Sequence, residues 1–362
     1  MIAMAALSGS PFRGMVIAPA DVSEIVEPAL RRSRRATVRL SRVTLKSMRL
    51  VHRRRIELMA DYIVRRLSAI YRTTPYIPEL HPFYRELASL LVDVDDLRRR
   101  LAKLKAATKV IRKIERDCLV MVRAAERRGD LMRARRAFLG RVLSVLEDLK
   151  EDLRAIREYQ LRLLKVPDID PELHTIVVAG PPNVGKSSFV RRVSTAEPEV
   201  REYPFTTKSL ILGHVIIDDL YVQVIDTPGL LDRPLSERNE AELQAILALK
   251  HLAGVIVFLV DPSQTCGYDV QYQVRVYREV REHFSQTPIL VCLNKVDVAS
   301  REQVGAAKSL MEGDVIEMSV ATGLNVDLVL ARALRLLGVP DYYVAKLSAS
   351  EQRSLSRRSS SS

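Results

Sequence analysis

Apolar residues recur every three or four positions between about residues 31 and 165, which is the spacing of one helix face. Charged residues fill most of the positions between them. One such series comprises Leu139, Val142, Leu146, Leu149, Leu153 and Ile156. The pattern predicts an all-α bundle of long helices over residues 31–168, including an antiparallel pair that turns near Arg128–Asp130.

Proline-rich segments mark the breaks in this pattern. The prolines within residues 75–82 predict the end of one helix and the start of the next. Two prolines within residues 166–171 end the helical part, because proline cannot continue a helix. Residues 1–30 contain scattered glycines and prolines and are predicted to be an irregular lead-in. Residues 341–362 become rich in serine and arginine and are predicted to be a disordered tail.

After residue 169, short β-branched runs alternate with helical stretches. The predicted strands are Thr175–Ala179, Leu212–Ile217, Tyr221–Ile225, Val255–Val260, Ile289–Leu293 and Val315–Met318. The predicted helices are Lys186–Val193, Glu237–Leu249, Val270–Phe284 and Val326–Leu337. This alternation predicts an α/β domain over residues 169–340, with a mostly parallel sheet and helices on both of its faces.

A phosphate-binding motif follows the first predicted strand and opens the first predicted helix. Residues 180–187 read Gly-Pro-Pro-Asn-Val-Gly-Lys-Ser, which has the spacing Gly-x4-Gly-Lys-Ser. Its glycines let backbone amides surround a phosphate, while Lys186 reaches the terminal phosphates and the Ser187 hydroxyl binds Mg²⁺. A chance turn with a surface lysine is the alternative, and the position between a strand and a helix argues against it. The predicted nucleotide contacts are Gly180, Pro181, Pro182, Asn183, Val184, Gly185, Lys186, Ser187 and Ser188.

A second group of candidate residues follows the strand predicted at Tyr221–Ile225. Asp226 is placed to hold Mg²⁺ through water, so it joins Ser187 as a predicted metal ligand. Gly229 lets its backbone amide approach the terminal phosphate, which gives it a catalytic role beside Lys186. The segment therefore predicts the magnesium side of a nucleoside triphosphate site.

Two later segments indicate which base is bound. Asn294, Lys295 and Asp297 follow the strand Ile289–Leu293. The Asp297 carboxylate can accept hydrogen bonds from the ring N–H and the exocyclic amine of guanine, a pair of donors that adenine lacks. Backbone amides of the residues after the last strand can donate to the guanine carbonyl, and these residues are Ser319, Val320 and Ala321. Since all these segments end strands, we predict a GTP/GDP site at that edge of the sheet.

The charge of the chain is unevenly distributed. Its net charge is +13, with 37 Lys/Arg and 21 Asp/Glu in residues 1–170 (+16) and 20 and 23 in residues 171–362 (−3). The basic clusters lie at Arg31–Arg35, Arg53–Arg55, Arg98–Arg100 and Arg133–Arg136, with further Lys and Arg near each. Any one cluster alone is an ordinary solvated helix face, but together they indicate nucleic-acid binding. The few aromatic residues favour phosphate contacts with folded RNA over base stacking.

The nucleotide motifs resemble those of the translation-factor class of P-loop GTPases over residues 175–337. Residues 203–208, Tyr-Pro-Phe-Thr-Thr-Lys, resemble the first switch segment of the Obg-related group. The resemblance implies that Thr207, with Thr206 as the alternative, is a metal ligand and catalytic residue. Leu230 stands where many GTPases carry a water-orienting glutamine, so slow hydrolysis until a partner or a cation completes the site is implied. Asn183 matches an asparagine that helps hold K⁺ in several such GTPases, which adds it to the catalytic group.

A long helical domain ahead of an Obg-like domain is similar to the Nog family of ribosome-assembly GTPases. Residues 76–84, Tyr-Ile-Pro-Glu-Leu-His-Pro-Phe-Tyr, resemble the proline-punctuated junction of that family, and the likeness spans residues 35–340. It resembles a compact, archaeal form of the family. The resemblance implies binding to the precursor of the large ribosomal subunit and its rRNA, under control of the bound nucleotide. A cytoplasmic, ribosome-associated location and an unidentified partner that stimulates hydrolysis are implied as well.

Two other functions stay open from the sequence. The helical part can bind a protein partner in signalling or trafficking, although its basic excess argues against this. It can also lie on anionic lipid, although the chain shows no lipidation motif and no Trp/Phe-rich apolar face, and no apolar run approaches a membrane span. We therefore expect no membrane partner.

Three widely spaced cysteines argue against a disulfide framework or a zinc site.

Overall fold

The computed structural model describes residues 9–35, 44–204 and 209–347 of the 362-residue chain. The lead-in before residue 9 and the predicted disordered segment from residue 348 onward lie outside the described residues.

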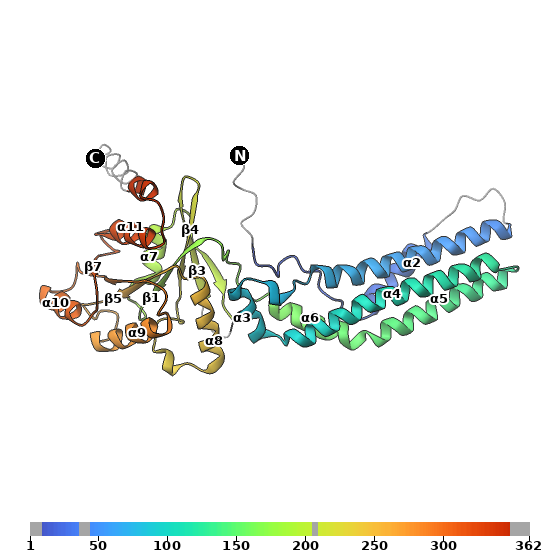
Figure 1. Cartoon of the computed structure of the whole chain (residues 1–362), viewed down its shortest axis with the longest axis horizontal. Helices are drawn as coiled ribbons and strands as arrows, with labels where there is room; N and C mark the ends of the chain where they lie inside the picture. The colour runs from blue at the N-terminus through green and yellow to red at the C-terminus, as the bar shows by residue number, and fades with distance from the viewer. Residues whose placement is uncertain (1–8, 36–43, 205–208, 348–362) are drawn as a thin grey trace. The chain divides into compact units, whose positions relative to one another are not determined.

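The contacts of the chain divide it into two units (Figure 1). The helical unit comprises residues 11–80 and 91–164. The sheet unit comprises residues 81–90 and the described residues from 165 onward, with residues 9 and 10. Each unit buries its own set of apolar side chains.

The helical unit confirms the predicted bundle of long helices. Its elements are α1 (Ser23–Arg34), α2 (Leu45–Thr73), the 3-10 helix η1 (Ile77–Glu79), α4 (Val94–Ala124), α5 (Arg128–Asp148) and α6 (Lys150–Leu163). Helices α2, α4 and α5 lie side by side (Figure 1). The turn between α4 and α5 occupies residues 125–127, directly before the predicted place. Local signals fix the starts of the long helices, because Thr44 forms a capping box with Ser47 and Asp93 accepts from the backbone N–H of Asp96.

The predicted apolar stripe is buried, but two helices share it. Val142 and Leu146 lie on α5 and Leu153 and Ile156 on α6, and all four are buried. Leu149 separates the two helices, with φ −92° and ψ −3°. The spacing of three and four continues through this junction because the chain there keeps a near-helical conformation, so the pattern alone does not reveal the break.

The predicted irregular lead-in over residues 1–30 is wrong from residue 23 onward. Helix α1 begins at Ser23 and contains Pro28, which removes the backbone bond to Glu24. The helix persists because Ile25 and Ala29 are fully buried in the core of the helical unit. Phe12, ahead of the helix, is fully buried too, so the described part of this segment belongs to the core.

The sheet unit confirms the predicted α/β fold. Its strands are β1 (His174–Ala179), β2 (Glu199–Glu202), β3 (Ser209–Ile217), β4 (Leu220–Asp226), β5 (Val255–Val260), β6 (Ile289–Leu293) and β7 (Val315–Glu317). They form one sheet in the order β2-β3-β4-β1-β5-β6-β7. Strands β4, β1, β5, β6 and β7 are parallel, and β3 and β2 add to one side in antiparallel fashion. The parallel strands therefore end at one common edge.

Helices cover both faces of this sheet. The helical elements of the sheet unit are α3 (Pro82–Leu91), α7 (Lys186–Val193), the 3-10 helices η2 (Leu235–Glu237) and η3 (Leu249–His251), α8 (Glu240–Ala248), α9 (Val270–His283), α10 (Arg301–Ser309) and α11 (Val326–Leu336), and not all of them contact the sheet. Figure 1 shows α7 and α11 on one side of the sheet and α8 and α9 on the other. Ile176 and Val178 of β1 share a buried cluster with Phe189 of α7 and Val329 of α11. This packing fixes α7 directly after the C-terminal end of β1.

The sequence pattern did not predict three helical or strand segments of the sheet unit. Strand β2 is mostly exposed, with Val200 69% exposed, so it carries no apolar alternation. Helix α10 buries only Ala307 among its described residues. The predicted tail is wrong over residues 341–347, which are helical and bury Val344.

Candidate nucleotide-binding site

The loop between β1 and α7 has two glycines in conformations that other residues rarely adopt. Gly180 has φ 133° and Gly185 has φ 103°. A Cβ at position 180 would lie 2.3 Å from the Leu259 carbonyl oxygen, and one at position 185 would lie 2.3 Å from Asn294 Nδ2. Residues at the ends of β5 and β6 therefore pack directly against the loop. This packing holds the loop backbone in place at the N-terminal end of α7.

Lys186 begins α7 and lies inside this loop. Its side chain is buried, and Nζ donates to the carbonyl oxygens of Gly180 and Pro181, each at 2.7 Å. Burial lowers the pKa of Lys186, while the nearby carboxylates of Asp226 and Asp232 raise it. A buried ammonium held only by neutral carbonyl oxygens can exchange them for phosphate oxygens, which bind it more strongly.

Ser187 and Asp226 meet at the end of β4. Ser187 Oγ donates to Asp226 Oδ2 at 2.5 Å, and Asp226 is fully buried. Its other oxygen, Oδ1, is buried without a hydrogen-bond partner among the described residues. Burial raises the pKa of Asp226, whereas the Ser187 hydroxyl and the Lys186 ammonium lower it. A hydroxyl beside an unpartnered carboxylate oxygen fits Mg²⁺ and its water ligands.

The segment after β4 holds a carboxylate close to the expected phosphate position. The backbone N–H of Gly229 donates to Asp232 Oδ2 at 2.7 Å, and Gly229 has φ 76°. Arg238 donates to Asp232 Oδ1 at 3.1 Å and to the Leu230 carbonyl oxygen at 2.8 Å. The Leu230 side chain is 1% exposed. The amide predicted to meet a terminal phosphate is thus bonded to a carboxylate, and no polar side chain stands at position 230.

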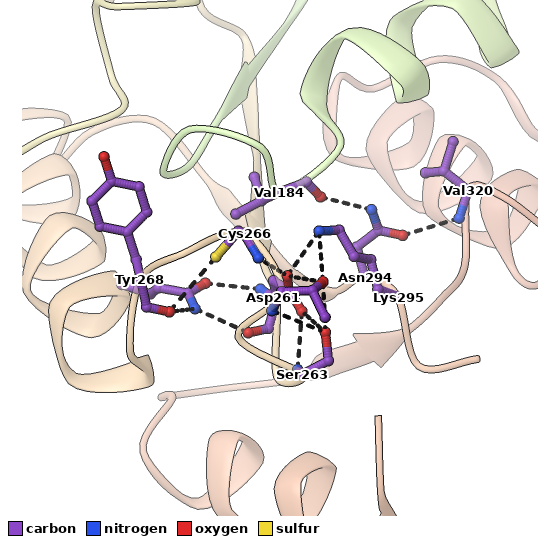
Figure 2. A network of polar contacts seen from close by, with 10 residues as sticks. Val184, Asp261, Ser263, Cys266, Tyr268, Asn294, Lys295 and Val320 are labelled. Carbon is purple, nitrogen blue, oxygen red and sulfur yellow. Dashed lines mark hydrogen bonds and ion pairs between the residues drawn. The ribbon is translucent and has the colours of Figure 1, made fainter. Parts of the chain in front are cut away.

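Asn294 connects the phosphate loop with the last predicted motif. Its Nδ2 donates to the Val184 carbonyl oxygen at 2.7 Å, and its Oδ1 accepts from the backbone N–H of Val320 at 3.0 Å (Figure 2). Asn294 is buried, and so are both its partners. One side chain therefore fixes three segments that are far apart in the sequence.

The predicted base-binding residues line a cavity of about 700 Å³. Asp297 is exposed there and has no hydrogen bond or ion pair within the part of the chain that the structure describes. The other lining residues are Gly185, Ser188, Arg191, Arg192, Thr265, Asn294, Lys295, Val298, Val320 and Ala321. Ser319 is buried beside the cavity, and its Oγ accepts from the Thr322 backbone N–H at 3.2 Å.

The predicted site residues that the structure describes lie at or directly after the C-terminal ends of β1, β4, β6 and β7. Pro181 is buried, Pro182 is half-buried, and Asn183 is exposed with φ 61°. Thr206 and Thr207, the predicted switch threonines, lie outside the described residues, so their role stays a prediction.

Asp261, which the sequence analysis did not select, organises the base-binding side. Lys295 Nζ donates to Asp261 Oδ2 at 2.9 Å, and the Cys266 backbone N–H donates to the same oxygen at 2.8 Å (Figure 2). Lys295 also donates to Thr265 Oγ1 at 3.0 Å and has φ 63°. Asp261 follows the fully buried strand β5 directly, which is the signal that could have identified it.

The arginine clusters of the helical unit are partly neutralised by neighbours. Arg100 bonds Asp96 at 2.5 Å and Asp152 at 2.8 Å, and Arg53 bonds Glu57 at 2.7 Å. Residues 39 and 42 of the first cluster region lie outside the described residues. The acidic partners are already counted in the net charge of +16, so the pairs show where within the unit the positive charge is compensated.

Two family models match the chain. Residues 12–170 match the NOG1 N-terminal helical domain, and residues 240–297 match the model described as Nucleolar GTP-binding protein 1 (NOG1). The two matches lie in the helical part and in the sheet part respectively.

Relatives match over most of the chain. The chain is 34% identical over 300 residues to the uncharacterised protein MJ1408 of Methanocaldococcus jannaschii, covering 82% of this chain and 83% of that protein. It is 36% identical over 320 residues to nucleolar GTP-binding protein 1 of Encephalitozoon cuniculi, and 31% identical over 304 residues to that of Kluyveromyces lactis. These two matches cover 87% and 83% of this chain but only 60% and 47% of those proteins.

A solved structure of the same name is similar too. The crystal structure of a Plasmodium falciparum nucleolar GTP-binding protein 1 is 32% identical and covers 52% of this chain and 98% of that chain, with a TM-score of 0.41.

Proposed function

We propose that this chain, which belongs to the NOG1 family of nucleolar GTP-binding proteins and is a GTPase, acts as a switch in assembly of the large ribosomal subunit. In this proposal the sheet unit binds GTP and hydrolyses it to GDP and phosphate. The helical unit docks on ribosomal RNA through its basic helices. The relatives from Encephalitozoon cuniculi and Kluyveromyces lactis carry the word nucleolar in their names. For this chain we propose a ribosome-associated location in the cytoplasm.

The observation that carries the GTP site is the Asn294 side chain. It bonds the carbonyl oxygen of Val184 in the phosphate loop and the backbone N–H of Val320 in the last motif. Phosphate binding and base binding are thereby built as one rigid edge of the sheet. Asp297 stands at that edge with its carboxylate exposed to the cavity. A carboxylate there favours guanine, because guanine offers two adjacent donors and adenine does not.

The residues around the phosphate position indicate slow intrinsic hydrolysis. Lys186 supplies positive charge, and Ser187 with Asp226 would hold Mg²⁺, which neutralises charge on the phosphates when bound. Leu230 is buried and apolar, so it cannot orient the attacking water. A partner, or K⁺ held beside Asn183, then has to complete the site.

The charge of the helical part supports RNA as the docking partner. Residues 1–170 carry a net charge of +16, from 37 basic and 21 acidic residues. Such an excess supports binding to phosphates in folded RNA. No helix within the described residues is long and apolar enough to cross a membrane.

Phosphate release by the purified full chain tests this proposal. We expect GTP turnover to rise at least about tenfold when precursors of the large ribosomal subunit are added, since partner activation of GTPases often exceeds that factor. Small-subunit particles at equal RNA concentration are the control. Equal effects of both particles would contradict a role in large-subunit assembly. The same assay in K⁺ and in Na⁺ tests the cation hypothesis, which equal rates would exclude.

A protein partner for the helical unit is the second candidate. Exposed apolar side chains occur on α4 and α5, with Val120 61% exposed, Leu143 42% exposed and Met121 40% exposed. Apolar surface of this kind favours a protein over RNA. Co-purification with ribosomal RNA that survives protein-stripping salt washes would decide against this candidate.

A further inference from the structure

Four buried polar side-chain atoms in the described helical unit have no hydrogen-bond partner. Each is a potential donor, and each lies on α1, α2 or α5. They are Ser33 Oγ, His52 Nδ1, Arg55 Nε and Arg135 Nε. Buried donors are normally bonded, so a group of unbonded ones marks a part of the unit that is short of acceptors.

The charges that act on two of these groups, His52 and Arg135, are positive. Burial lowers the pKa of His52, and the charges of Arg135, Arg55 and Arg128 lower it further. Burial likewise lowers the pKa of Arg135, and the charges of Arg55 and Arg34 add to that effect. Among the described residues, no carboxylate is a cause of either pKa shift. We call Arg34, Arg55, Arg128 and Arg135, with His52 among them, the arginine cluster.

Two neighbouring arginines on α2 and α5 are neutralised by carboxylates, unlike Arg55 and Arg135. Arg53 on α2 pairs with Glu57 at 2.7 Å, and Arg133 on α5 pairs with Asp130 at 2.5 Å. Arg55 and Arg135, each two residues further along, have no ion pair with any described residue and are only partly exposed. Partly buried cations without a counter-ion destabilise a fold unless an anion binds there.

We propose that the arginine cluster binds phosphate groups of an RNA backbone. Guanidinium groups can donate two parallel hydrogen bonds to one phosphate. Several cations side by side suit a backbone that presents consecutive phosphates better than a single carboxylate. This inference rests on the RNA docking proposed above and assigns that docking to α1, α2 and α5.

The first test uses inorganic phosphate and needs no RNA. Sodium phosphate should raise the melting temperature of the full chain above its value in sodium chloride of equal ionic strength. The double variant Arg55→Gln/Arg135→Gln should lose this gain, and without phosphate it should melt no lower than the wild type, since it removes like charges. The control Arg53→Gln/Arg133→Gln removes the same charge from the same helices and should keep the gain. Equal phosphate gains in all three proteins would overturn the proposal.

The second test uses an A-form RNA duplex with the same three proteins. The Arg55/Arg135 variant should bind at least about tenfold more weakly, and its salt dependence, the slope of log K against log salt, should fall by about 1 to 2. The control should lose less than about threefold. A second variant, Arg34→Gln/Arg128→Gln, changes only exposed side chains and should weaken binding too. Equal RNA affinities of wild type, control and both cluster variants would overturn the assignment.

These tests separate this inference from the proposed function. If the cluster variants lose phosphate and RNA binding but the wild type never joins large-subunit particles, the cluster stands and the ribosomal role fails. If the wild type joins those particles and the cluster variants join them equally well, the cluster assignment fails and the ribosomal role stands.

Discussion

Single side chains of the sheet unit decide how tightly the nucleotide site is built. Gly185 leaves room for Asn294 Nδ2, which a Cβ would approach to 2.3 Å. Asn294 in turn bonds Val184 and Val320. A residue larger than glycine at position 185 would therefore displace the Asn294 side chain and disturb the site.

Asp297→Asn should change which base is bound. The substitution replaces an acceptor by a donor facing the guanine amine, so GTP affinity should fall roughly 100-fold. Xanthosine triphosphate, which has a carbonyl in place of that amine, should then bind the variant better than GTP does. Nucleotide titration of wild type and variant measures both changes. A preserved preference for GTP over ATP and xanthosine triphosphate would show that Asp297 does not select the base.

Asp232→Asn should favour GTP over GDP. The Asp232 carboxylate accepts from the Gly229 backbone N–H and acts electrostatically on both Lys186 and Asp226, so it lies where a terminal phosphate would compete with it. Removing its charge should raise GTP affinity relative to GDP roughly tenfold, about 1.4 kcal/mol. Asp219→Asn, remote from the phosphate loop in sequence and exposed, is the control. An unchanged GTP/GDP ratio would mean that Asp232 does not compete with the phosphate.

The sequence predicted the motif residues of this site but not the residues that hold the motif segments in place. Lys186, Asp226 and Asn294 stand at recognisable spacings after strands. Asp232 bonds the Gly229 backbone N–H three residues before it, and Arg238 bonds Asp232 six residues before it. These contacts are local, but they lie in a segment without helix or strand periodicity, so the sequence pattern did not single out either residue.

At the scale of elements, the strongly apolar segments were predictable and the weakly apolar ones were not. Strands β5 and β6 match their predicted bounds because both are buried runs of apolar residues. Strand β2 has almost no buried residue, so its backbone pairing with β3 defines it instead. Helix α1 escaped prediction since Pro28 suggests a break, although tertiary burial of Ile25 and Ala29 outweighs it.

Asp96→Asn should weaken the hydrogen bonding between α4 and α6 and lower the stability of the helical unit. Asp96 accepts from Arg100, Arg99 and the Tyr159 hydroxyl, the last at 3.0 Å, and these hydrogen bonds hold its pKa well below its usual range. The variant should lose about 1–3 kcal/mol of unfolding free energy at pH 7. Urea unfolding measures this, and the exposed neighbour Asp95→Asn is the control.

The pH dependence of that loss follows from the lowered pKa. A carboxyl group with a lower pKa in the folded state stabilises the fold above its unfolded pKa, about 3.9, and loses this effect as the pH falls through the folded value. The difference between wild type and Asp96→Asn should therefore shrink below about pH 4. A difference that stays constant between pH 7 and pH 3 would exclude the charged hydrogen bonds as its cause.

At the scale of the whole molecule, the two units divide the proposed work. The sheet unit carries the nucleotide edge, and the helical unit carries the basic surface with its unpaired arginine cluster. A switch requires that the nucleotide state of one unit change the affinity of the other for its partner, which is a coupling free energy between two sites.

Sedimentation of cell extract with a GTP analogue, with GDP and without nucleotide tests this claim most directly. The account predicts that the chain moves with large-subunit particles in the presence of the analogue and leaves them with GDP. Lys186→Ala should bind nucleotide roughly 10- to 100-fold more weakly, because it loses a charged hydrogen bond to phosphate, and should not respond to the analogue. A chain that stays at the top of the gradient in every nucleotide state, even at low salt, would contradict the ribosomal role.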